Sequence, residues 1–180
     1  MRDDDGILMS QLKGGQVKAL AGLVEKYKKQ AYFLALGMVG NSDEAFDISQ
    51  EAFIRVYNSA AKFDESQSFF PWFYSIVANL CRNALRKRKT IRTVDIQDVE
   101  YMLADKETPE SAYLEAEEKK RLYHSLMKLT FADREIIILN HFRLMSYDEI
   151  AALLDIPKGT VMSRLYYARK RLAAIMENEE

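Results

Sequence analysis

Hydrophobic residues recur every three to four positions along most of the chain, which is the spacing of one buried face of an α-helix. In the first half, this pattern predicts helices at about residues 7–13, 17–38, 41–61 and 71–89. Gly14-Gly15 and Gly40-Asn41 separate the first three helices, and Pro71 suits the first position of the fourth. Asn41, with Glu44 three residues later, is expected to cap the third helix.

The same spacing continues in the second half, where it predicts helices at about residues 112–129, 133–142, 146–154 and 161–175. Ser146 and Glu149 form the S-x-x-E pattern of a capping box. Pro157 and Gly159 are expected to stop that helix, because Pro lacks a backbone donor and Gly tolerates positive φ. Thr160 can cap the helix that follows. Two short helices joined by a tight turn are typical of a helix-turn-helix, within an all-α fold.

The last helix separates apolar from polar side chains. Its inward stripe contains Val161, Leu165, Ala168, Leu172 and Ile175. Its outward face contains Met162, Ser163, Arg164, Tyr166, Tyr167, Arg169, Lys170 and Arg171. No acidic residue occurs from Lys158 through Met176. Such a face suits the phosphates of DNA, with the N-terminal turns against base edges. A solvated basic helix is the alternative interpretation.

The helix predicted at residues 41–61 has two unlike faces. One is apolar and is expected to pack inward, with Ala45, Phe46, Ala52, Phe53, Val56, Tyr57 and Ala60. The other contains Asp47, Gln50, Glu51, Ile54 and Asn58. An apolar side chain among carboxylates and amides resembles the centre and rim of a protein interface. A solvated polar face and a docking surface both remain open at this point.

The helix predicted at residues 71–89 also has two faces. The side expected in the core contains Trp72, Phe73, Ile76, Val77, Leu80, Cys81, Ala84 and Leu85. The side expected to be exposed contains Tyr74, Ser75, Ala78, Asn79, Arg82, Asn83 and Arg86. The cations from Arg86 to Lys89, with Arg92 beyond them, suit a helix C-terminus through the dipole. An exposed aromatic, amides and cations also suit an unpaired nucleic-acid strand. Both interpretations remain open.

The charge is segregated along the chain. Residues 1–92 carry 14 Lys and Arg against 10 Asp and Glu, residues 93–120 carry 3 against 9, and residues 121–180 carry 9 against 8. Residues 93–111 have no sustained hydrophobic period and contain Thr108-Pro109, so they are expected to form a flexible acidic linker. The linker would join an N-terminal helical domain at residues 1–92 to a C-terminal domain at residues 112–180.

The composition argues against catalysis, metal binding and membrane insertion. Cys81 is the only cysteine and His124 and His141 are the only histidines, so we expect no intrachain disulfide and no metal site. The sequence shows neither a nucleophile paired with a base nor a Gly-rich phosphate loop, so we expect no enzymatic activity and no cofactor. Met1-Arg2 is followed by three aspartates, unlike a signal peptide, and the apolar run Ala31–Gly40 is about half of a membrane span. A cytoplasmic location follows.

The order of these motifs resembles that of the extracytoplasmic-function (ECF) class of bacterial RNA polymerase sigma factors. Residues 47–57, DISQEAFIRVY, and the F-x-x-W within residues 69–89 are similar to its core-polymerase-binding and −10-reading segments. Residues 147–172, YDEIAALLDIPKGTVMSRLYYARKRL, are similar to its −35-reading helix-turn-helix. The resemblance covers about residues 10–175. It implies a subunit that directs promoter-specific initiation, reading the −35 duplex and capturing the melted −10 strand.

The resemblance also implies roles for individual residues. The residues expected to meet the clamp helices of the largest polymerase subunit are Asp47, Gln50, Glu51 and Ile54. Those expected at the −10 single strand are Phe70, Trp72, Tyr74, Ser75, Asn79, Arg82, Asn83 and Arg86. Those expected at the −35 duplex are Lys158, Thr160, Met162, Ser163, Arg164, Tyr166, Tyr167, Arg169 and Lys170. Implied partners are core polymerase, including the flap of its second-largest subunit, promoter DNA and an anti-sigma factor, which is membrane-bound or soluble.

Several positions depart from the family pattern. Met162 stands where Lys is common, Ser75 where Arg is common and Asn83 where Asp is common, and Tyr166-Tyr167 replaces a basic or His-containing pair. The two lost cations are expected to weaken phosphate contacts or to shift promoter preference. A free-standing helix-turn-helix regulator, with residues 17–89 as a sensor or dimerisation domain, remains the alternative. Such a regulator would occupy a duplex site unaided.

Overall fold

The computed structural model describes residues 4–90, 121–142 and 145–178. Every regular element in these ranges is helical, which confirms the all-α prediction. The chain divides into two compact units, residues 1–94 and 95–180. The predicted linker, residues 93–111, lies outside the described residues. No helix among the residues described has the length and apolar character needed to span a bilayer.

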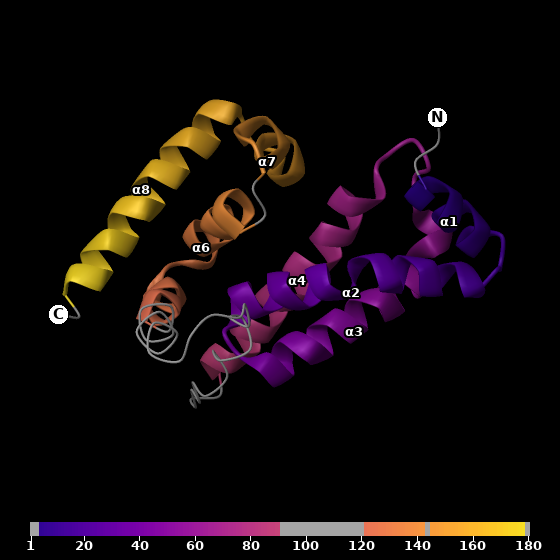
Figure 1. Cartoon of the computed structure of the whole chain (residues 1–180), viewed down its shortest axis with the longest axis horizontal. Coiled ribbons are helices and arrows are strands. Elements are labelled where there is room, and N and C mark those ends of the chain that lie inside the picture. Colours follow the sequence, from indigo (N-terminus) through magenta and orange to yellow (C-terminus); the bar gives the residue numbers. More distant parts are fainter. Residues whose placement is uncertain (1–3, 91–120, 143–144, 179–180) are drawn as a thin grey trace, which may run out of the picture. The chain divides into compact units, whose positions relative to one another are not determined.

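The first unit is a bundle in which three long helices lie along one another (Figure 1). Its elements are α1 (Asp4–Lys13), α2 (Lys18–Val39), α3 (Ser42–Ser59), η1 (Ala60–Lys62) and α4 (Phe69–Thr90). Asn41 caps α3 as predicted, because its side chain accepts a hydrogen bond from the Glu44 amide at 2.8 Å. Leu23, Phe73 and Val77 are fully buried between the helices, and Cys81 is a core residue as expected.

Helix α4 begins two residues earlier than predicted. Phe69 is its first residue, and Pro71 lies within the first turn, where a missing N–H costs nothing because the first amides of a helix have no intrahelical partner. Starting at Phe69 buries that ring against Tyr27, with ring centroids 5.1 Å apart, and against Phe73, at 5.3 Å. An aromatic cluster therefore fixes the start of α4.

Four side chains in this unit lie on the face opposite to the one predicted. Tyr74 and Ala78 were expected to be exposed, but they are 2% and 1% exposed, because α1, α2 and α3 all contact α4 and its buried arc is wide. Phe46 and Tyr57 were expected in the core, but they are 54% and 48% exposed. Helix α3 packs mainly against α2 and α4, and the side that carries Phe46 and Tyr57 is left exposed.

The second unit contains the helix-turn-helix. Residues 121–128 are helical and are followed by α6 (Phe131–Ile137), the π-helical turn η3 (Ile138–Phe142), α7 (Tyr147–Leu154) and α8 (Lys158–Glu177). Residues 112–120 of the first predicted helix lie outside the described residues. Helix α8 contacts both α6 and α7 (Figure 1). The capping box at Ser146 and Glu149 is confirmed.

The turn between α7 and α8 differs from the prediction in two ways. Asp155 takes the left-handed conformation that ends α7, with φ of 51°, whereas Gly159 lies inside α8. Helix α8 begins at Lys158, so Thr160 is not its cap. The Pro157 carbonyl accepts hydrogen bonds from the amides of Thr160 and Val161, which starts the helix before Thr160 is reached. Val161, Leu165 and Ala168 are buried as predicted.

Candidate nucleic-acid and protein interfaces

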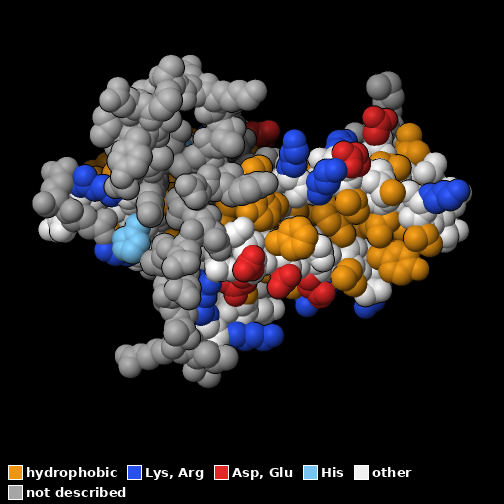
Figure 2. Space-filling model, turned by 60° about the horizontal axis from the view of Figure 1, so that its bottom comes forward, with side chains coloured by type: hydrophobic (Ala, Val, Ile, Leu, Met, Phe, Trp, Pro, Cys, Tyr) orange, Lys and Arg blue, Asp and Glu red, His pale blue; other side chains and the backbone are white. Residues whose placement is uncertain are grey.

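Helix α3 presents a surface that mixes exposed apolar and acidic side chains. Asp47, Gln50 and Ile54 are exposed, and Ile54 is 54% exposed. Glu51 forms an ion pair with Arg55 one turn later, at 2.9 Å. Figure 2 shows hydrophobic and acidic side chains gathered on neighbouring parts of this side of the first unit. We give the name α3 ridge to the half-buried Glu51 together with the exposed residues Phe46, Asp47, Gln50, Ile54, Tyr57 and Asn58.

Phe46 and Tyr57 are members of the α3 ridge that sequence reasoning missed. They follow the same helical spacing as the buried Phe53, so the apolar pattern assigned all three aromatic rings to the core. Single exposed apolar side chains are ordinary, but Phe46, Ile54 and Tyr57 lie on one helix beside carboxylates. An apolar centre with a charged rim is the composition of a protein interface.

The loop before α4 is held at both ends. Phe63 and Phe69 are buried on either side of it, and Lys13 of α1 donates a hydrogen bond to the Phe63 carbonyl at 3.3 Å. Within the loop, the Asp64 carboxylate accepts hydrogen bonds from the amide of Ser66 at 2.9 Å and from its hydroxyl at 2.8 Å. These bonds, the backbone one first, lower the pKa of Asp64. The loop therefore presents residues 64–68 to solvent in a fixed turn.

The aromatic residues expected at an unpaired strand are less exposed than a stacking platform requires. Phe70 is half-buried, with its ring centroid 6.1 Å from that of Tyr27 and 6.4 Å from that of Tyr74. Trp72 is also half-buried, 5.0 Å from Phe63. Tyr74 is fully enclosed, so its expected exposure is wrong and its ring has no face open for a base.

The polar side of α4 carries paired amides and cations. Arg82 donates to the Asn79 carbonyl oxygen at 2.9 Å, and Arg86 donates to that of Asn83 at 3.0 Å. The Ser75 hydroxyl donates to the carbonyl of Trp72 at 2.7 Å, within its own helix. Asn79, Arg82 and Arg86 are exposed and Asn83 is half-buried, on one side of the helix. This arrangement suits a nucleic-acid backbone that passes along α4.

One cation of the Arg86 to Lys89 run has a structural role. Arg88 donates to the Val39 carbonyl at 3.0 Å and pairs with Glu44 at 3.0 Å, so it fastens the end of α4 to the junction of α2 and α3. The sequence pattern placed Arg88 among the cations that suit an unpaired strand, so it overestimates the positive charge available there. The Lys89 side chain and Arg92 lie outside the described residues.

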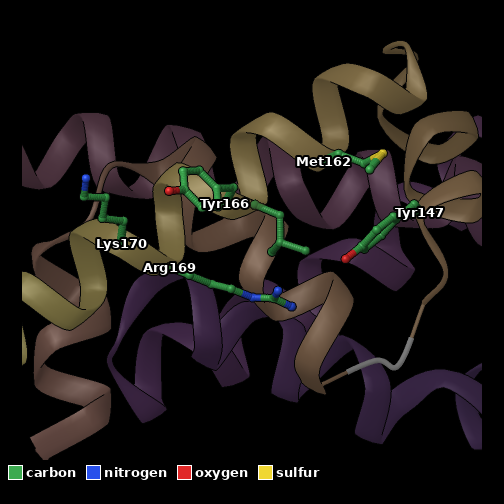
Figure 3. A pocket seen from close by; sticks show the side chains of 6 residues that line it. Tyr147, Met162, Tyr166, Arg169 and Lys170 are labelled. Atoms are coloured by element: carbon green, nitrogen blue, oxygen red, sulfur yellow. The ribbon is translucent and has the colours of Figure 1, made fainter.

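Helix α8 exposes its expected DNA-facing side chains. Met162, Tyr166 and Tyr167 are 52%, 62% and 54% exposed, and Ser163, Arg164 and Lys170 are also exposed. Lys158 pairs with Asp148 of α7 at 2.8 Å, and Thr160 is half-buried. An open groove of about 590 Å³ lies beside this face, lined by Tyr147, Met162, Leu165, Tyr166, Arg169 and Lys170 (Figure 3).

Three arginines of the second unit make contacts that sequence reasoning did not find. Arg171, expected to face solvent only, pairs through two nitrogens with Asp133 of α6, at 2.6 and 2.9 Å. Arg134 is buried and donates to the carbonyls of Leu126, Met127 and Leu129, which ends the helix at residues 121–128. Arg169 donates to two side chains of the π-helical turn η3.

The sequence matches two families that follow one another along the chain. Sigma-70 region 2 matches residues 23–91, and Sigma-70, region 4 matches residues 119–172. The first match spans α3 and α4, and the second covers α6, α7 and α8 as far as residue 172.

Curated relatives and solved structures are similar over nearly the whole chain. The ECF RNA polymerase sigma factor SigW of Bacillus subtilis is 34% identical over 172 residues, which cover 91% of this chain and 92% of that protein. The structure of CnrH in complex with the cytosolic domain of CnrY is similar with a TM-score of 0.73 and 25% identity, over 99% of this chain and 100% of CnrH. The sigma factor RpoE, solved with the anti-sigma factor NepR from Bartonella quintana, shares the fold with a TM-score of 0.67 at 22% identity, over 91% of this chain and 99% of RpoE.

Proposed function

The chain belongs to the ECF RNA polymerase sigma factors, and from this premise we propose that it binds core RNA polymerase and directs initiation at its own class of promoter. The observation that carries the proposal is the pair of family matches in the order region 2 then region 4, within an alignment that spans 91% of the chain. The polymerase supplies the chemistry, and this chain supplies promoter choice without being an enzyme itself. Its place of action is then the cytoplasm.

In this proposal the α3 ridge meets the clamp helices of the largest polymerase subunit. The expected contacts are Asp47, Gln50, Glu51 and Ile54. Ile54 and the exposed rings of Phe46 and Tyr57 form the apolar centre, with the polar side chains as its rim. Desolvated apolar side chains contribute most of the affinity of such interfaces, while charged rims mainly set orientation and association rate. The flap of the second-largest subunit is the expected contact of the second unit.

The −10 strand lies, in this proposal, along the loop at residues 64–68 and the polar side of α4. The contacting residues there are Phe70, Trp72, Ser75, Asn79, Arg82, Asn83 and Arg86. Tyr74 is left out of this set because its ring is buried. The half-buried Phe70 and Trp72 form the wall of the site, whereas the amides and guanidinium groups supply donors to bases and phosphates.

The −35 duplex lies, in this proposal, against α8, with α7 crossing the backbone. Met162 and Ser163 lie on the exposed face of the N-terminal turns, where base edges are read, and Tyr166 and Tyr167 lie one turn further along the same helix. The remaining residues of the set contact phosphates or support the turn: Lys158, Thr160, Arg164, Arg169 and Lys170. Met162 favours apolar contact with a thymine methyl over a phosphate contact at this position.

An anti-sigma protein is a further partner in this proposal. RpoE, which shares the fold, was solved with an anti-sigma factor, and CnrH was solved with the cytosolic domain of another protein. The exposed apolar side chains of the α3 ridge and of α8 are the surfaces that such a partner would cover. If the anti-sigma protein is membrane-bound, it would hold this chain at the membrane.

The test is promoter binding with and without core polymerase. We expect a labelled promoter fragment, selected from a genomic pool by transcription in vitro, to be retarded by the chain and core enzyme together and not by the chain alone. Glu51→Arg should abolish association with core enzyme, because it reverses a charge in the α3 ridge beside Arg55. Glu25→Arg, a matched reversal on α2 at an exposed residue, should leave association unchanged. A footprint by the chain alone on a palindrome would favour a free-standing regulator.

A further inference from the structure

Arg169 lies at the edge of the exposed face of α8. Met162, Tyr166 and Arg169 are spaced by four and then three residues, so they form one row along the helix. All three line the open groove, with Tyr147 of α7 on its other side (Figure 3). In that view the Arg169 side chain extends from α8 toward Tyr147. A guanidinium in this place borders the surface that would meet DNA.

Two side chains of the π-helical turn η3 hold this guanidinium. Arg169 donates from Nε to the Nε2 atom of His141 at 3.1 Å and from Nη2 to the Oδ1 atom of Asn140 at 2.9 Å. An arginine has five N–H donors, so these bonds leave three N–H groups for another ligand. Short π-helical turns are frequent at functional sites, and this one brings two consecutive acceptors to one arginine.

One of the two acceptors is itself held by the backbone, and the other depends on its protonation state. Asn140 donates from Nδ2 to the carbonyl of Met145 at 3.0 Å, which turns its Oδ1 toward Arg169. His141 accepts at Nε2 only when its ring is neutral. Burial first, and then the charge of Arg169, lower the pKa of His141, which favours the neutral ring. The segment just before α7 is therefore linked through Asn140 to the recognition helix.

We propose that Asn140 and His141 are positioning residues that hold Arg169 ready for a phosphate of the DNA backbone at the edge of the groove. This inference rests on the proposed function, because it needs a duplex at α8. A free arginine side chain loses rotamer freedom when it binds, at a cost of about 0.5–1.5 kcal/mol for an immobilised side chain, which is about a two- to tenfold change in affinity. Holding Arg169 beforehand removes that cost.

The proposal excludes Asn140 and His141 from direct readout of bases. Their effect on promoter binding passes through Arg169, so it should vanish when Arg169 is absent. A residue that only stabilised the second unit would weaken binding equally with or without Arg169. This difference separates positioning from a structural role, and a double-mutant cycle measures it.

The test uses the full chain bound to core polymerase, on a promoter duplex selected from a genomic pool by transcription in vitro. We expect His141→Ala and Asn140→Ala each to weaken binding about two- to tenfold. Arg169→Ala should also reduce the slope of log affinity against log salt by about one unit, as loss of one phosphate contact does. Adding His141→Ala to Arg169→Ala should change nothing further. His141→Gln, which keeps an acceptor, should recover most of the loss.

The matched background is Arg164→Ala, an exposed arginine on the same helix. In the Arg164→Ala background, His141→Ala should weaken promoter binding as much as it does in the unmodified chain. Equal losses from His141→Ala with and without Arg169, or no loss at all, would overturn the inference. Thermal unfolding of each variant identifies those that misfold. If Asn140→Ala is unfolded, the two His141 variants alone test the inference. If the unmodified chain with core enzyme fails to initiate, both the proposed function and this inference fail. If it initiates normally but the losses from His141→Ala and Arg169→Ala are additive, only the inference fails.

Discussion

Three arginines make contacts within the fold, and two of them, Arg88 and Arg171, belong to basic runs that the sequence pattern assigned to nucleic acid. Arg88 fastens α4 to the junction of α2 and α3, and Arg134 ends the helix at residues 121–128. Arg171 binds Asp133 through two nitrogens and ties α8 to α6. Bidentate arginine pairs with a carboxylate are stronger than ordinary ion pairs because the planar fork matches both oxygens. The charge available to DNA is smaller than the count of cations suggests.

Arg171→Ala should destabilise the second unit. Asp133 is 7% exposed, so removing its partner leaves a largely buried carboxylate with one remaining side-chain bond, to Thr130. We expect a loss of about 1–3 kcal/mol, the cost of leaving a buried polar group without its partner. Hydrogen exchange of amides in α6 and α8 measures this loss of stability. Tryptophan fluorescence would not, because Trp72 lies in the first unit. Arg164→Ala, at an exposed position, should change stability by less than about 0.5 kcal/mol. Equal protection of these amides in Arg171→Ala and Arg164→Ala would contradict a stabilising role for the pair of Arg171 with Asp133.

Glu149 makes the capping box of α7 dependent on pH. Its carboxylate accepts hydrogen bonds from the amide and the hydroxyl of Ser146, both at 2.8 Å, and these bonds lower its pKa. The charged form is therefore favoured in the fold, so its contribution is present above the ordinary pKa of 4.5 and is lost as the pH falls through the lower folded value. We expect amides of α7 to be better protected in the unmodified chain than in Glu149→Ala at pH 7, with the difference shrinking as the pH falls below 4.5. A difference independent of pH would contradict this assignment.

Two helices of this fold, α2 and α7, end at a single residue in the left-handed region. Gly40 follows α2 with φ of 75°, where glycine has no steric penalty, and Asp155 follows α7 with φ of 51°, where a side chain does. Gly40→Ala should therefore lower the free energy of unfolding of the first unit by about 1 kcal/mol, and Asp155→Gly should raise that of the second unit by up to about 1 kcal/mol. Urea denaturation followed by circular dichroism measures both. The same sign for the two changes would show that backbone strain does not decide them.

The sequence predicts those features of the elements that local spacing determines. Asn41 and Ser146 cap the helices that they were expected to cap, and Val161, Leu165 and Ala168 face inward. Burial depends instead on how many neighbours a helix has, which no single helix encodes. Tyr74 is buried because α1, α2 and α3 all contact α4, and Tyr57 is exposed because it lies on a side of α3 that its main neighbours, α2 and α4, do not cover. The roles expected for the exposed residues at polymerase and DNA remain predictions.

Arginine contacts were missed for a related reason. Arg171 meets Asp133 across 38 residues and Arg88 meets the Val39 carbonyl across 49, so both pairings are consequences of the packed fold. A basic run near a helix end gives no sign of which cation turns inward. The π-helical turn at Ile138–Phe142 likewise has no signal in the hydrophobic spacing, yet it places Asn140 and His141 beside Arg169.

The two units share one chain, and we expect that covalent connection to supply much of the promoter affinity. If the first unit is bound to core polymerase, the second meets the −35 duplex as an intramolecular event. Linking two binding modules in this way commonly raises overall affinity by about 10²–10⁴ without any new contact. Each unit has its own buried core, so separation of the two need not unfold either.

Cutting the chain between the units should therefore abolish specific initiation at ordinary concentrations. A protease site placed within residues 95–111 allows cleavage after the chain has bound core polymerase. We expect the first unit to stay on the enzyme, because the α3 ridge is intact, while binding to the −35 duplex falls by about a hundredfold or more. Transcription in vitro before and after cleavage measures the loss, and the same chain without the protease site is the control. Adding excess second unit in trans should restore part of the activity, since the missing quantity is local concentration. Full activity after cleavage would mean that the second unit reads its duplex without help from the tether.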